Sequence, residues 1–163
     1  MSVVDELLAH NASYQASFDQ GDLPSTPSLR LAVVTCMDAR MDVLRILGLR
    51  PGEAQVIRNG GGLITDDVMR SLVVSQWVSN TKEILLLRHT DCGMTKFDEQ
   101  ELSERVGQHA GGPLRYSLGS FGNSEEDLRA SLHALREARE LLHRDHIHGF
   151  LYDVSSGGLA AVN

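Results

Sequence analysis

The sequence predicts an α/β fold: a mostly parallel central β-sheet flanked by helices, with an N-terminal helical arm. Apolar runs of strand length alternate along the chain with segments of helix length, an order typical of parallel sheets. The apolar runs are continuous instead of alternating with polar residues, as in strands that are buried on both faces. The 163 residues suit one domain, which we expect to span 1–163.

The first 28 residues are expected to form the arm and its linker. Residues 4–18 have the pattern of a short amphipathic helix, and 21–28 (GDLPSTPS) form a connector rich in proline and serine. A helix separated from the body in this way packs either on a second subunit or on the chain's own surface. The sequence allows both arrangements.

The body begins with a predicted strand at Leu31–Cys36 (LAVVTC). A helix at Met41–Leu47 follows and ends near Gly48, a typical helix terminator. A second, short strand is predicted at Ala54–Arg58, directly before a run of three glycines.

The middle of the chain continues the alternation. Thr65 is a good N-cap for a helix that runs to about Ser79, because Asp66 and Asp67 fall in its first turn. A third buried strand is predicted at Glu83–Arg88. We expect the next helix to begin near Cys92–Gly93 and to extend through the acidic run DEQELSER.

The last third contains a loop, a long helix and two strands. Residues 111–124 are rich in glycine, serine and proline and are expected to form a loop that ends at Ser124, the predicted cap of a helix at Glu125–His143. A fourth strand is predicted at Gly149–Val154. The glycines at 157 and 158 then turn the chain into a short final strand.

Composition excludes several classes of function. The content of 42% hydrophobic residues suits a globular core, and the net charge of −7 with no cluster of lysine and arginine argues against nucleic acid or anionic membranes as partners. The most apolar run, Ile84–Leu87, is far shorter than the roughly 20 residues of a membrane span. The N-terminus lacks the basic and apolar regions of a signal peptide, so we expect a cytoplasmic protein.

The chain has two cysteines, Cys36 and Cys92. A structural disulfide is not expected in a reducing cytosol. Buried inert thiols and metal-binding or catalytic thiols are the two remaining interpretations, and the neighbouring residues decide between them.

Three polar motifs follow three predicted strands. Cys-Met-Asp-Ala-Arg (36–40) follows the first, Arg-Asn-Gly-Gly-Gly (58–62) the second, and His-Thr-Asp-Cys-Gly (89–93) the third. In open α/β sheets, ligands bind outside the carboxyl ends of the strands. The three motifs therefore predict a functional site at this edge.

The residue types favour zinc. Thiolate and imidazole are preferred zinc ligands, and the His-x-x-Cys spacing allows His89 and Cys92 to reach one ion together with Cys36. A structural site has four protein ligands, whereas three credible ones are present here. Three ligands leave one position for water, which is the catalytic arrangement. We predict one Zn²⁺ per chain.

Asp38 and Arg40 accompany this site. A carboxylate near zinc accepts the proton of a bound hydroxide or ligates the metal itself, so Asp38 is also a candidate fourth ligand. Arg40 can hold that carboxylate by two parallel hydrogen bonds. Taken alone, such a pair is more often a structural salt bridge.

Other motifs have simpler interpretations. The glycine run at 60–62 lacks the neighbouring residues of a phosphate-binding loop, so a tight turn is predicted there. The remaining histidines of the second half lie in polar sequence and are expected at the surface, with proton transfer as the minority interpretation; they are His109, His133, His143, His146 and His148.

Together, Cys-x-Asp-x-Arg, Arg-Asn-x-Gly-Gly and His-x-x-Cys-Gly, in this order, resemble the β-class carbonic anhydrases. The resemblance covers about Leu31–Phe97 closely, and the short length and the HTDCGM wording are most similar to the compact, actinobacterial-type members. One departure is Gly60, where many members carry alanine or another small residue. A pocket glutamine found in plant-like members has no counterpart that we can assign.

The resemblance implies an activity and a site. Zinc would be held by Cys36, His89 and Cys92, with Asp38 and Arg40 as a catalytic dyad and Asn59, Gly60 and Gly61 in the pocket-forming loop; zinc-bound hydroxide would attack carbon dioxide to give bicarbonate. It also implies a homodimer, or a tetramer built from two dimers, with the N-terminal helix wrapping the partner.

Two alternatives stay open. Carbonyl sulfide and carbon disulfide hydrolases resemble this family and use similar zinc sites, so the motifs do not separate the three gases. A non-catalytic zinc or redox module is the alternative from another class. The presence of Asp38 and Arg40 beside Cys36 argues against it, since a purely structural site has no use for such a pair.

Overall fold

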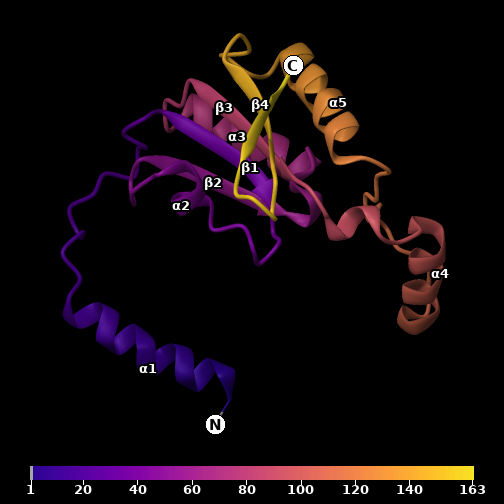
Figure 1. Cartoon of the computed structure of the whole chain (residues 1–163), viewed down its shortest axis with the longest axis horizontal. Coiled ribbons are helices and arrows are strands. Elements are labelled where there is room, and N and C mark those ends of the chain that lie inside the picture. The colour runs from indigo at the N-terminus through magenta and orange to yellow at the C-terminus, as the bar shows by residue number, and fades with distance from the viewer. Residues whose placement is uncertain (1) are drawn as a thin grey trace.

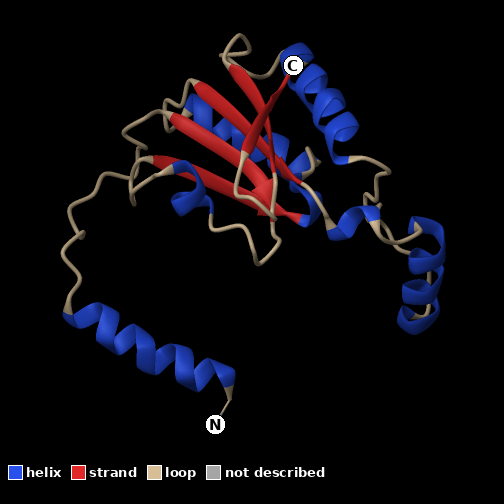
Figure 2. Ribbon diagram, viewed as in Figure 1, coloured by secondary structure: helices blue, strands red, loops and turns tan. Residues whose placement is uncertain are grey.

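The computed structural model describes residues 2–163 and contains one five-stranded sheet (Figures 1 and 2). Four strands are parallel and the last is antiparallel to its neighbour. This confirms the predicted mostly parallel α/β fold. The spatial order is β2-β1-β3-β4-β5, with β1 at Leu31–Cys36, β2 at Ala54–Asn59, β3 at Glu83–His89, β4 at Ile147–Tyr152 and β5 at Leu159–Val162.

The central strands are buried on both faces, as their continuous apolar sequence predicts. Every residue from Ala32 to Cys36 in β1 is buried. One face packs against two helices, α3 (Asp66–Trp77) and α5 (Ser124–Glu137), whose leucine and valine side chains join the strands in a single core. Burying an apolar side chain of this size stabilises the fold by about 1.5–3 kcal/mol.

The strand order creates a switch point between β1 and β3. From β1 the chain first moves outward to β2 and then returns to place β3 on the other side of β1. The connections that leave the carboxyl ends of β1 and β3 therefore run in opposite directions, and a crevice forms there. Cys36 ends β1 and His89 ends β3, so both lie at this point.

Two short helices follow β1 and β2. Helix α2 (Val43–Leu47) begins two residues later than predicted, because the Asp42 side chain accepts a hydrogen bond from the Arg45 amide and caps it. The glycine run forms a short 3₁₀ turn, η1 (Gly60–Gly62), in agreement with the predicted tight turn.

The single helix predicted from Cys92 through the acidic run is wrong. The structure has a short 3₁₀ turn, η2 (Gly93–Thr95), and then a separate helix, α4 (Glu99–Ala110). The Asp98 side chain accepts a hydrogen bond from the Glu101 amide and so caps a new helix instead of continuing an old one. Figure 1 shows α4 projecting from the side of the molecule.

The long helix α5 is shorter than predicted at its C-terminal end. It ends at Glu137 instead of His143, and its cap is Asn123 instead of Ser124. The side chain of Gln76 on α3 accepts hydrogen bonds from the amides of Leu142 and His143 and donates to the His143 carbonyl. These tertiary hydrogen bonds satisfy backbone groups that a longer helix would have satisfied internally.

The N-terminal helix α1 (Val3–Ala16) lies apart from the body (Figure 1), as the predicted arm requires. It starts in a capping box formed by Ser2 and Asp5. Within residues 2–163, none of its side chains is buried. In the same described range, no helix is long and apolar enough to cross a membrane.

Candidate metal centre

Three potential metal ligands meet at the crevice between β1 and β3. The ligand atoms of Cys36, His89 and Cys92 all lie within 4.8 Å of one another, and the two sulfurs are 4.0 Å apart. All three side chains are buried. Two sulfurs bound tetrahedrally at about 2.3 Å from one zinc ion would be roughly 3.8 Å apart, so the observed spacing fits a shared ion.

The imidazole of His89 is oriented for metal binding. Its Nδ1 lies 2.8 Å from the carbonyl oxygen of Thr90. A carbonyl only accepts, so Nδ1 donates its proton there and Nε2 presents a lone pair to the cysteines. Among the buried side-chain nitrogen and oxygen atoms of residues 2–163, two have no hydrogen-bond partner: His89 Nε2 and Asn59 Oδ1. A buried nitrogen without a partner, aimed at two thiols, is what a metal ligand requires.

The surroundings favour a thiolate at Cys36. Burial raises the pKa of its thiol, but the adjacent His89 imidazole and the backbone amides of Asp38 and Gly61 outweigh burial and lower it. Burial and the nearby Cys36 raise the pKa of Cys92 instead. One thiolate therefore forms readily, and the second is expected to form when a cation neutralises the pair.

Asp38 and Arg40 form the predicted pair beside the cluster. Arg40 Nε donates to Asp38 Oδ1 at 3.0 Å, Nη2 donates to Oδ2 at 2.8 Å, and the Arg40 amide also donates to Oδ1. These hydrogen bonds hold the pKa of the Asp38 carboxyl far below its usual range. Asp38 Oδ2 lies only 3.9 Å from His89 Nε2, so the carboxylate is next to the ligands while both of its oxygens face Arg40.

Two residues of the predicted motifs support this pair in roles that the sequence did not predict. Arg58 donates to the backbone carbonyls of Cys36 and Asp38, which fixes the loop after β1. Asp91 accepts a hydrogen bond from Arg40 at 2.8 Å and also pairs with Lys96. The Asp in His-Thr-Asp-Cys was visible in the sequence, but its partner lies 51 positions earlier and no local pattern marks it.

A buried arginine, Arg88, fixes the glycine turn η1 through a hydrogen bond to its backbone. Arg88 on β3 donates to the carbonyl of Gly62, to Ser131 Oγ and to the Asp127 carboxylate on α5. Gly62 has φ +67°, and a Cβ there would lie 2.7 Å from the carbonyl carbon of Thr35. The turn therefore lies directly on the end of β1, which only glycine permits.

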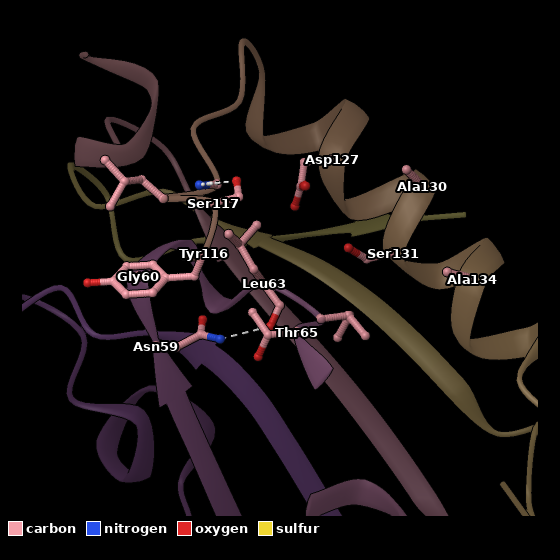
Figure 3. A pocket seen from close by; sticks show the side chains of 13 residues that line it. Asn59, Gly60, Leu63, Thr65, Tyr116, Ser117, Asp127, Ala130, Ser131 and Ala134 are labelled. Carbon is pink, nitrogen blue, oxygen red and sulfur yellow. Dashed lines mark hydrogen bonds between the residues drawn. The ribbon is translucent and has the colours of Figure 1, made fainter. Parts of the chain in front are cut away.

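A cleft of about 760 Å³ lies on the far side of this turn (Figure 3). Asn59 and Gly60 border it, and Asp127 and Ser131 on α5 face the loop that carries Ser117. Two residues of the predicted pocket loop, Asn59 and Gly60, therefore border this cleft, whereas the third, Gly61, borders the metal cluster. The other residues that line the cleft are Leu63, Ile64, Thr65, Tyr116, Leu118, Gly119, Ala130 and Ala134.

The remaining histidines lie outside this centre. Of the five histidines in the second half of the chain, four are exposed, as predicted, and one is half-buried. His148 lies 3.7 Å from a carboxylate oxygen of Glu83, and the half-buried residue is His143. The three-donor group is therefore separate from them.

The donor set matches zinc chemistry: two sulfurs and one imidazole nitrogen, all buried, with the hydrogen bond from Nδ1 to the Thr90 carbonyl orienting the histidine. Such a site at the carboxyl edge of a parallel sheet defines the class as a zinc enzyme. Comparison with known proteins gives the family. The family model for carbonic anhydrase matches residues 31–144, and the chain belongs to the β-carbonic anhydrases, which use zinc.

Similar proteins extend over the whole chain. β-Carbonic anhydrase 1 of Mycobacterium tuberculosis is 43% identical over 162 residues, which cover 99% of both chains. Among solved structures, the carbonic anhydrase of Streptococcus mutans superposes with a TM-score of 0.92 at 36% identity, covering 100% of this chain and 99% of that one. The similarity thus includes the helical arm.

Another similarity is shorter. The carbon disulfide hydrolase of Saccharolobus solfataricus is 45% identical over 75 residues, which cover 46% of this chain and 37% of that protein. A solved carbon disulfide hydrolase superposes with a TM-score of 0.71 at 27% identity. The predicted relation to such enzymes is confirmed, but in sequence it covers less than half of the chain.

Proposed function

We propose that the protein is a zinc-dependent carbonic anhydrase that catalyses the reversible hydration of carbon dioxide to bicarbonate. The observation that carries the proposal is the buried group of Cys36, His89 and Cys92 with the Asp38–Arg40 pair beside it. Three ligands suit a metal that retains one position for water, and a carboxylate held beside them suits the orientation of that water. The full-length similarity to β-carbonic anhydrase 1 supports the same reaction.

Each side chain has a proposed role. The zinc, when bound, lowers the pKa of its water so that a nucleophile is present at neutral pH. Asp38 would orient the reacting water by accepting its hydrogen bond, because the carboxylate lies beside the ligand group, with Oδ2 3.9 Å from His89 Nε2. Arg40 holds Asp38 in this position, because its guanidinium occupies both carboxylate oxygens. Without Arg40, Asp38 becomes the candidate fourth ligand and closes the site.

The surroundings of the glycine turn suit an apolar gas. A Cβ at Gly60 would lie 3.3 Å from the sulfur of Met94 and 3.9 Å from the methyl carbon of Met37. A Cβ at Gly61 would lie 2.8 Å from the ring of Phe121. Carbon dioxide has no net dipole, so we propose that this apolar wall receives it.

Ligand substitutions test the proposal. Replacing Cys36, His89 or Cys92 by alanine should abolish zinc binding and carbon dioxide hydration together. Asp38→Ala should retain one zinc per chain and lose most of the activity. The matched control is Asp67→Ala, which removes an exposed aspartate from α3 and should change neither property. One zinc per chain in each of the three ligand variants would contradict the assignment.

Carbon disulfide and carbonyl sulfide are the second candidate substrates. The observation that favours these substrates is the similarity of the chain to relatives named carbon disulfide hydrolase. We favour carbon dioxide because the similarity to those enzymes covers less than half of the chain. Initial rates on the three gases, measured on one zinc-loaded sample, decide the question. Turnover of carbon disulfide without turnover of carbon dioxide would overturn the first choice.

A non-catalytic zinc or redox module is disfavoured by the site itself. A redox pair has no use for a third donor, whereas the buried Nε2 of His89 faces both sulfurs and has no hydrogen-bond partner among the described residues. Because metal binding requires both thiols to stay reduced, we also propose a cytoplasmic location.

We propose a homodimer, or a tetramer of two dimers, in which α1 packs on the partner. Six apolar side chains of the arm are exposed over 49% or more of their surface, and apolar surface gathered in this way marks an interaction site: Val3, Val4, Leu7, Leu8, Tyr14 and Phe18. The double variant Leu7→Asp/Leu8→Asp should lower the sedimentation coefficient. The same oligomer in this variant would exclude the arm from the interface.

A further inference from the structure

Arg40 has a second carboxylate partner besides Asp38. Its Nη1 donates to Asp91 Oδ2 at 2.8 Å, and its Nη2 donates to the Asp91 backbone carbonyl at 3.1 Å. Nη2 is therefore shared between the loop that follows β1 and the loop that follows β3. The guanidinium connects the two segments that supply the metal ligands.

Asp91 is built firmly into this contact. It lies between two ligands, His89 and Cys92, and its backbone has φ +55°, a left-handed conformation that aspartate and asparagine tolerate better than most residues. Lys96 donates to its other carboxylate oxygen. Both oxygens of Asp91 are thus engaged by cations, and the carboxylate cannot rotate away from Arg40 without losing both.

We propose that Asp91 is a positioning residue that keeps Asp38 off the metal by holding the outer edge of Arg40. The inference rests on the proposed function and adds a determinant of whether the fourth position is open. Asp38 Oδ2 is already 3.9 Å from His89 Nε2, so a small rotation of an unrestrained carboxylate brings it to the ligand cluster. Arg40 prevents this rotation only while it is itself fixed.

The alternative is that Asp91 acts only as a charge near the metal. The two explanations predict opposite signs for the binding of a small anion. Removing a negative charge near the metal strengthens anion binding through simple electrostatics. Releasing Arg40 lets Asp38 occupy the anion's position, so anion binding weakens.

The experiment uses cobalt-substituted full-length protein and thiocyanate, with affinity read from the visible spectrum of the metal. Asp91→Asn retains the left-handed backbone and removes the charge, and Asp91→Gly also removes the side chain. We expect thiocyanate affinity to fall about tenfold in Asp91→Asn, the scale of one charge-assisted hydrogen bond, and further in Asp91→Gly. Metal content should stay at one ion per chain in both variants.

Two comparisons keep the test specific. Asp67→Asn removes the same charge from an exposed ion pair on α3 and should leave thiocyanate affinity unchanged. Lys96→Met removes the second restraint on Asp91 and should weaken affinity by less than Asp91→Asn does. Unchanged or tighter thiocyanate binding in both Asp91 variants would overturn the inference. Wild-type protein without carbon dioxide hydration would instead overturn the proposed function.

Discussion

Two arginine networks flank the same strand ends, and they differ in depth. Arg40 is 47% exposed and joins Asp38 and Asp91 at the mouth of the metal centre. Arg88 is 1% exposed and joins the glycine turn to Asp127 on α5. Both connect segments that are distant in sequence, by the same type of charge-assisted hydrogen bond.

The difference in burial separates stability from chemistry. An exposed ion pair contributes about 0–1 kcal/mol to folding, because water solvates its partners equally well once they are apart. Breaking a buried pair leaves charges and polar groups without solvent and costs about 3–5 kcal/mol. We therefore expect the Arg88 network to maintain the fold beneath the site, and the Arg40 network to control reactivity at small cost in stability.

The largest expected effect is at Arg88. Arg88→Met should lower the free energy of unfolding by about 3 kcal/mol, because the Asp127 carboxylate and the Gly62 carbonyl lose their donor. Urea unfolding of the zinc-loaded protein measures this value. Arg70→Met, which breaks the exposed pair with Asp67, is the control and should change stability by less than about 0.5 kcal/mol. Equal losses in the two variants would remove the contrast between buried and exposed networks.

The next effect breaks the same network at the glycine turn. Gly62→Ala should destabilise the protein by about 2–3 kcal/mol and weaken zinc binding. The added Cβ meets backbone atoms of Thr35 and Cys36 at 2.7 and 2.9 Å and imposes an unfavourable positive φ. Denaturant unfolding measures the loss of stability, and zinc titration measures the loss of zinc affinity.

Gly93→Ala is the matched control for that turn. Gly93 also adjoins a predicted metal ligand, but apart from its two chain neighbours no described residue has an atom within 4 Å of the position of its Cβ. It should bind zinc as the wild type does. A Gly62→Ala protein with wild-type stability would show that the turn can move away from β1.

Arg40→Gln tests the exposed network. We expect the free energy of unfolding to change by less than about 1 kcal/mol. Carbon dioxide hydration should fall about 100-fold, the scale of one lost acid–base contribution, because Asp38 is no longer held in place. Stopped-flow rates and urea unfolding on the same zinc-loaded sample give both numbers. A large stability loss with unchanged turnover per folded molecule would reverse the roles assigned to the two arginines.

The smallest effect concerns a third network, at the cleft. Glu99 accepts hydrogen bonds from the Ser117 hydroxyl and from the amides of Leu118 and Ser120. These bonds lower the pKa of Glu99, although burial opposes them. Because the pKa of Glu99 is lower in the folded than in the unfolded protein, the stabilisation by its ionised carboxylate is complete above the unfolded pKa of about 4.3. That stabilisation is lost as the pH falls through the folded pKa.

Amide hydrogen exchange tests this sign. After correction for intrinsic rates, the protection of Leu118 and Ser120 should be constant above about pH 5 and should fall below about pH 4. Glu99→Gln should show the low protection at every pH, and Glu104→Gln on the same helix should behave as the wild type does. Protection that rises on acidification would contradict the assignment.

The local chemistry of the site could be predicted from the sequence. Cys36, His89 and Cys92 are identified by residue type, by spacing and by their place after apolar runs, because ligand preference is a property of the side chain and the ends of parallel strands share one edge. Asp38 and Arg40 are two residues apart, so their pairing is also local. The strands could be predicted because continuous apolar runs, a local feature of the sequence, indicate strands that are buried on both faces.

The errors and omissions arose where partners are distant in sequence. The end of α5 depends on Gln76, which satisfies the backbone near His143 across 67 positions. The exception is the separation of η2 from α4, which has a local cause: the Asp98 side chain caps a new helix through the Glu101 amide, three residues further on.

The sequence by itself therefore predicted zinc, the three donor residues that the structure brings together, and the strand edge that carries them. Only the tertiary structure decided how firmly that edge is held. Arg40 meets Asp91 across 51 positions and Arg88 meets Asp127 across 39, and no periodicity encodes such distances. The physical reason is that burial sets the energy of a charged contact, and burial is a property of the folded chain.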